Sequence, residues 1–112
     1  MPSYRMHLPI GELFPGTSPG DVMEQAALAL GTLHAVEKKD VEAPLIGDRR
    51  VGRAVLRFAV DASSRADEDA AARHAIAVVI DHLTGSVGQI APASAVVLTR
   101  SAGGRLRAIS PF

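Results

Sequence analysis

The chain has 112 residues, 47% of them apolar and 21% charged, and its twelve basic side chains balance its twelve acidic ones. This composition excludes a disordered chain and indicates one folded domain over residues 1–112. Zero net charge gives no overall attraction for nucleic acid or anionic membranes, and the lack of cysteine excludes disulfides and thiolate metal sites.

The N-terminal residues carry no sign of a signal peptide, since they lack a basic start followed by an unbroken apolar run. No apolar segment approaches the ~20 residues that a membrane-spanning helix needs. Together with the absence of cysteine, this predicts a cytoplasmic protein without membrane contact.

The first strand is predicted over residues 4–10, where apolar and polar side chains alternate with a period of two. Arg5 and His7 lie on its polar side. Pro9 has no backbone donor, so the strand should lose its hydrogen-bonded ladder on one side there.

Two helices are predicted from their boundary residues and apolar stripes. Ser18 suits the N-cap and Pro19 the first position of a helix that ends between residues 31 and 34. The second helix should span residues 67–84, with three acidic residues in its first turn and Gly85 just past its end.

Between the helices, residues 35–45 form a charged, uneven segment that suits an edge strand. Gly47 fits a type II′ turn leading into a third strand over residues 50–62. Counting back from this turn places Glu42 opposite Arg53 but Lys38 opposite Arg57. The count therefore predicts an acidic partner for Arg53 alone.

The C-terminal segments, residues 95–100 and 105–110, flank a Gly-Gly turn and should form a hairpin. The element order is then β-α-β-β-α-β-β. Both helices can bury their stripes on one face of a mostly antiparallel sheet, which predicts an α+β fold with the ferredoxin-like split β-α-β arrangement and an extra C-terminal strand.

This topology places the first strand between the third strand and the strand after the second helix, so their outward side chains share one open face. The residues expected there are Arg5, His7, Val51, Arg53, Val55, Arg57 and, if Leu106 faces the core, Arg105 and Arg107.

Three interpretations compete for this face: a solvated surface, a contact between copies of the chain or with another protein, and a site for anions or nucleic acid. Valines among arginines are typical of protein interfaces, and we expect a homo-oligomer, a dimer first. Nucleic acid has less support, because Tyr4 and Phe58 should face the core and leave no stacking platform.

No catalytic or metal-binding pattern is present, so we expect a protein that is not an enzyme and has no cofactor. The four histidines lack ligand spacing, and an alternative enzymatic hypothesis rests on His7 beside the arginines. The loop over residues 11–20 ends at a helix N-terminus without a phosphate-binding motif. Phe14 in that loop should be packed.

Overall fold

The structure, a computed structural model, describes residues 2–112, with Ile46 described by its backbone alone. It has two α-helices, α1 (Pro19–Gly31) and α2 (Arg65–Ser86), and a short 3-10 helix, η1 (Ala93–Ala95). Its strands are β1 (Ser3–Leu13), β2 (Ala35–Glu42), β3 (Leu45–Ile46), β4 (Arg49–Arg50), β5 (Arg53–Ala59), β6 (Gly88–Ile90), β7 (Val97–Ala102) and β8 (Arg105–Ile109).

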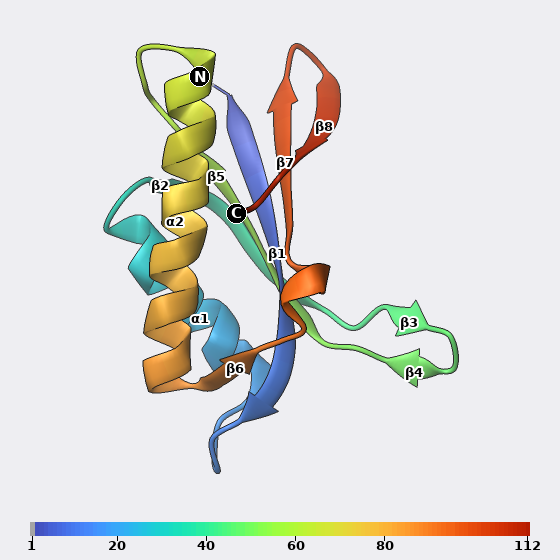
Figure 1. Ribbon diagram of the computed structural model, residues 1–112. Helices are drawn as coiled ribbons and strands as arrows, with labels where there is room; N and C mark the ends of the chain where they lie inside the picture. Colours follow the sequence, from blue (N-terminus) through green and yellow to red (C-terminus); the bar gives the residue numbers. More distant parts are fainter. Residues whose placement is uncertain (1) are drawn as a thin grey trace.

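The main sheet is antiparallel, with the strand order β2-β5-β1-β7-β8, and both helices pack on one of its faces (Figure 1). This confirms the predicted α+β fold, with β8 as the strand added to the ferredoxin-like order. Among the described residues, no helix is both long and apolar enough to cross a bilayer.

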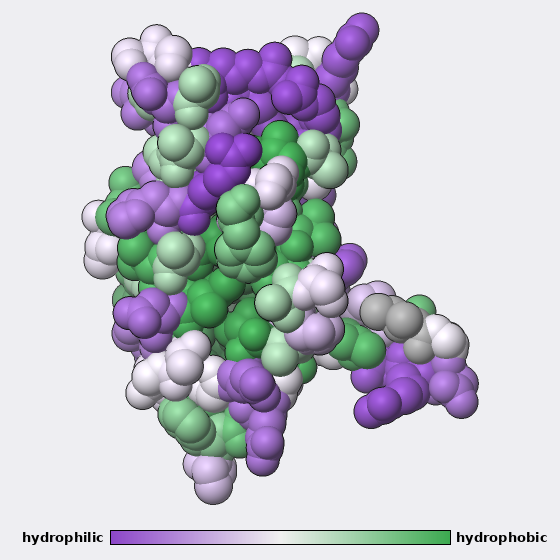
Figure 2. All heavy atoms as spheres, in the orientation of Figure 1, coloured by the Kyte–Doolittle hydropathy of each residue, from purple (hydrophilic) through white to green (hydrophobic). Residues whose placement is uncertain are grey.

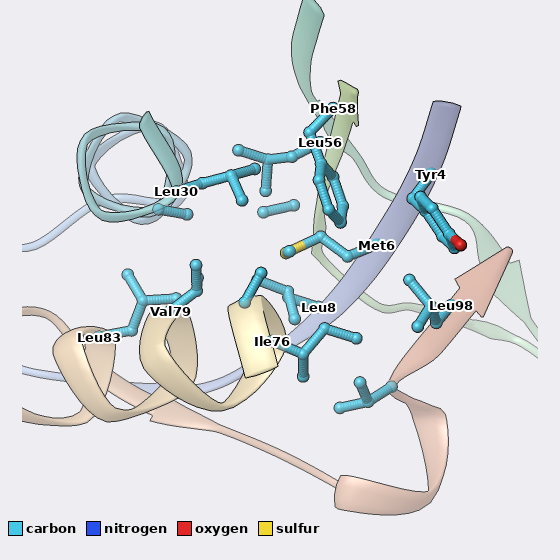
Figure 3. Close-up of a cluster of buried hydrophobic side chains, with 14 of the residues drawn as sticks. Tyr4, Met6, Leu8, Leu30, Leu56, Phe58, Ile76, Val79, Leu83 and Leu98 are labelled. Atoms are coloured by element: carbon cyan, nitrogen blue, oxygen red, sulfur yellow. The ribbon is translucent and has the colours of Figure 1, made fainter. Parts of the chain in front are cut away.

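The core lies between the helices and this sheet (Figure 3). Tyr4, Met6 and Leu8 of β1 alternate inward and are completely buried, as the period of two predicts. The largest other buried side chains are Val22, Leu30, Leu56, Phe58, Val60, Ile76, Val79, Leu83 and Leu98. A shift of β1 by one residue would turn its three buried side chains to the opposite face, so burial specifies the register strongly.

Both helices begin at serine N-caps. Ser18 and Asp21 form a reciprocal capping box at α1, and Ser64 accepts a hydrogen bond from the Asp67 amide at α2. The predicted end of α2 is wrong, because the helix continues through Gly85 to Ser86. Gly88 has the positive φ, +143°, and a Cβ there would lie 2.5 Å from the Glu12 carbonyl oxygen. Glycine is therefore required at Gly88, because the β1 backbone comes too close there to leave room for a side chain.

Several strand boundaries also differ from the prediction. β5 begins at Arg53, so Val51 and Gly52 fall in the connection to the β3–β4 hairpin, which projects from the body (Figure 1). β1 continues to Leu13 because its second half pairs with β6, a strand within the segment predicted as a loop. The sequence of β6, Gly88–Ile90, shows no alternation of apolar and polar side chains that would predict a strand.

The predicted pairings around the central strand are confirmed. The β1–β7 ladder ends at His7 whereas the β1–β5 ladder continues to Pro9, as expected where proline supplies no donor. Gly47, with φ +64°, closes the hairpin that pairs Ile46 with Arg49.

The two glycines at the end of α2 should respond oppositely to alanine. Gly88→Ala forces a Cβ against the β1 backbone in a conformation that L residues avoid, and we expect a loss of about 1–3 kcal/mol or more in unfolding free energy. Gly85→Ala, with nothing within 4 Å of the added Cβ, should instead stabilise the helix by up to about 1 kcal/mol. Urea denaturation measures both, and equal effects would contradict this account.

Candidate functional site

The most distinctive surface is the side of the sheet that the helices do not cover, called here the open face. Its rows follow from the strand registers, in which Arg5 lies between Arg57 and Thr99, and His7 between Val55 and Val97. The open face comprises Ser3, Arg5, His7, Glu37, Lys38, Asp40, Glu42, Arg53, Val55, Arg57, Val97, Thr99, Ser101, Leu106 and Ala108.

Five of the predicted residues, Arg5, His7, Arg53, Val55 and Arg57, lie together on this face. Val51 does not share the register of these residues, because β5 begins only at Arg53. The sequence predicted the alternation of β5 but gave no signal that the strand starts three residues later than expected.

The predicted positions of Arg105 and Arg107 are wrong, because both lie on the helix side of the sheet. Arg107 pairs with Arg100, whose guanidinium donates to the Tyr4 hydroxyl beneath the helices. Leu106 pairs with Ser101 and therefore points to the open face, where its side chain is 63% exposed. The side chains of β8 alternate as predicted. The register with β7, however, places Arg105 and Arg107 on the helix side and Leu106 on the open face.

Two open-face arginines have acidic partners. Arg53 forms an ion pair of 2.7 Å with Glu42, as predicted. The prediction that Arg57 has no acidic partner is wrong, since Glu37 lies 3.4 Å from its Nε. An irregularity between Val36 and Lys38 inserts an extra residue that a regular register cannot anticipate.

The apolar part of the open face lies toward β7 and β8. Val55 is 9% exposed, in a region lined by Arg5, Asp40 and Arg57, whereas Val97 is 37% exposed. Val97 lies beside His7, whereas Leu106 lies opposite Ser101 toward the other end of β7. Arg5, Thr99 and Leu106 help to line a hollow of about 80 Å³ there. The exposed apolar side chains of the open face are therefore Val97 and Leu106, on β7 and β8, whereas Val55 of β5 is buried.

His7 occupies the middle of the open face. Burial first, and then the positive charges of Arg53 and Arg5, lower the pKa of His7, while Glu42 acts in the opposite direction. Its Nδ1 atom and the Thr99 hydroxyl are buried and make no hydrogen bond to the described residues. A general base is usually oriented by a partner within hydrogen-bonding distance, and His7 lacks one here.

The other candidate sites are explained by local structure. His82 bonds Gln25, and His34 packs 5.8 Å from the Phe58 ring. Over residues 2–112, apart from the Ile46 side chain, no group of three or more potential metal ligands occurs. In the glycine-rich loop, Ser18 caps α1 itself, and the expectation that Phe14 is packed is wrong, since it is 47% exposed.

A polar cluster that sequence reasoning missed joins the sheet to α2. The Tyr4 hydroxyl donates to Asp69 and accepts from Arg100, while Arg100 also donates to Glu68 at 3.0 Å. Burial and the bond to Asp69 raise the pKa of Tyr4 to about 12. These residues are far apart in sequence, so no local pattern could have identified them.

The open face therefore offers a mixed charged and apolar surface, and Arg100 is held in place on the other side of the sheet. Among the described residues, no hydrogen bond pairs a general base with a nucleophile on this face. Comparison with known proteins finds no family model, curated protein or solved structure that matches the chain.

The polar cluster should be required for stability. Tyr4→Phe keeps the ring that stacks on Phe58 but removes a hydroxyl bonded to two charged groups, so we expect a loss of about 1.5–3 kcal/mol in urea denaturation. Ser3→Ala, which removes an exposed bond to Glu37, should cost much less. Equal losses would show that the cluster contributes no more than a surface contact.

The pKa of His7 predicts the sign of a pH effect. Because its folded-state value lies below the ordinary 6.5, the unfolded chain binds more protons in that window, and stability should fall on acidification below about pH 7. His7→Gln should reduce this fall. Part of the fall should remain, because burial also lowers the pKa of His34. NMR titration of the His7 ring checks the cause, and a midpoint at or above 6.5 would exclude it.

Proposed function

We propose that this protein is a non-enzymatic module that associates with a second copy of itself through the open face. The observation that carries the proposal is the exposure of Val97 and Leu106 on a sheet face that no helix covers. Placing these side chains against a partner removes apolar surface from water, which is the main driving force of association.

The charges of the open face favour a second copy as the partner. Acidic side chains follow the β2 edge, while arginines lie on β5 and β1, so one surface carries both signs. Arg5 and Asp40 form no ion pair within residues 2–112 as described, whereas Arg53 and Arg57 do. In a two-fold dimer the same surface supplies both partners, and free charges of opposite sign can meet across it.

The size of the face predicts a weak dimer. Five strands about 4.8 Å apart, each contributing about five residues, project to roughly 400 Å². A standard interface buries about 800 Å² on each partner. The open face is therefore smaller than a standard interface, and we expect a transient, reversible dimer with a Kd of about micromolar or weaker.

Anion or nucleic-acid binding through the same arginines has weaker support. Arg53 and Arg57 are each neutralised by a glutamate, and Tyr4 and Phe58 are completely buried, so no aromatic of the sheet can stack on bases. An enzyme using His7 would need a group to orient it, and the described residues supply none within hydrogen-bonding distance.

Sedimentation equilibrium from about 1 to about 500 µM tests the proposal. The wild-type chain should pass from monomer to dimer across this range. Val97→Glu should weaken the dimer at least about tenfold, because it buries a charge in the apolar part of the contact. Leu28→Glu is the matched control, since Leu28 is 64% exposed on α1, on the opposite side of the sheet, and its substitution should leave dimerisation unchanged.

A strict monomer at every concentration would overturn the proposal and leave a solvated face as the explanation. Equal weakening by Val97→Glu and Leu28→Glu would also overturn it, because it would assign the effect to net charge rather than to the open face.

A further inference from the structure

We propose that the hollow between the β7–β8 hairpin and the first turn of α2 binds a compact diphosphate group. This site lies on the helix side of the sheet and is separate from the open face. It is an open hollow of about 260 Å³, lined by Arg65, Arg100, Ala102, Arg105 and Arg107.

The fold brings together lining residues from the start of α2 and from the β7–β8 hairpin, which are far apart in the sequence. The hairpin and the start of α2 lie at the same end of the molecule (Figure 1), and strongly hydrophilic residues gather over this end in Figure 2. Arg105 and Arg107 project from alternate positions of β8, while Arg65 is the first residue of α2.

One of the four arginines is held in place by protein contacts. The Arg100 side chain is 11% exposed, lies 3.0 Å from Glu68 and 3.2 Å from Asp69, and donates to the Tyr4 hydroxyl. These bonds fix its guanidinium against α2 and restrict its motion. Arg100 therefore gives the hollow a rigid positively charged wall.

The other three arginines are not neutralised by ion pairs in the part of the chain that the structure describes. Four guanidinium groups line the hollow, and among the described residues Glu68 and Asp69 form ion pairs with one of them, Arg100. Arg107 also lies directly opposite Arg100 in the β7–β8 ladder, and like charges at such positions destabilise a sheet. A bound anion would relieve this repulsion.

The chemistry of the lining favours phosphate. Guanidinium groups bind phosphate oxygens through two parallel hydrogen bonds. Of the five described residues that line the hollow, four are arginines and Ala102 alone is apolar. None of the described residues that line the hollow is aromatic, so they offer no stacking surface for a base. One water needs roughly 10–15 Å³ of free volume, so a hollow of about 260 Å³ has room for a group as large as two linked phosphates.

Isothermal titration of the full chain with inorganic diphosphate, at about 0.1 M salt, tests the site. We expect diphosphate to bind at least about tenfold more tightly than orthophosphate. The double variant Arg105→Gln, Arg107→Gln should lower the affinity at least about tenfold, and it should fold because both side chains are exposed. The matched control is Arg49→Gln, Arg50→Gln on the β3–β4 hairpin, which removes the same charge and should leave affinity within about threefold.

Equal losses in the two double variants, or no binding of diphosphate by the wild-type chain, would overturn the proposal. ADP distinguishes the sources of the group: affinity equal to that of diphosphate identifies the bare diphosphate as the recognised unit, and tighter binding identifies a nucleoside diphosphate. Tighter binding of a single-stranded oligonucleotide than of diphosphate or ADP would overturn the proposal that the ligand is a compact diphosphate group. Val97→Glu should not alter diphosphate binding, so this test is independent of dimerisation.

Discussion

The structure depends on the pairing of β1 with a strand on each side. Over residues 3–7, β1 forms ladders with both β5 and β7, and its side chains must alternate between the two faces of the sheet. Tyr4 and Met6 are buried inward, so Arg5 and His7 must face outward. The core and the open face are thus consequences of the same backbone constraint.

The arginines divide between the two faces by the same alternation. Arg5, Arg53 and Arg57 lie on the open face beside carboxylates of β2, whereas Arg100, Arg105 and Arg107 lie on the helix side. Neither helix covers the outer part of β8, so arginines on its inner side remain exposed to solvent. A chain with zero net charge can therefore carry a local excess of positive charge at one end.

The cluster of Tyr4, Asp69 and Arg100 connects these regions. Tyr4 belongs to the core by its ring and to the polar cluster by its hydroxyl, and Arg100 extends from that cluster to the arginine-lined hollow. Buried polar networks are stabilising only when their members are satisfied, and here each member has a partner of suitable chemistry. The side chain that forms the rigid wall of the hollow is therefore also part of the packing between sheet and helix.

By itself, the sequence determined the two helices, the central strands and their order, because the Ser18 cap and the periods of 3.6 and 2 are local properties of the chain. It also placed Arg5, His7, Arg53, Val55 and Arg57 on one face correctly. Only the tertiary structure decided the side of Leu106, the ion pair of Arg57 with Glu37 and the cluster around Tyr4. These depend on strand register, on an inserted residue and on contacts between distant segments, and a change of one residue in register exchanges the two faces of a strand.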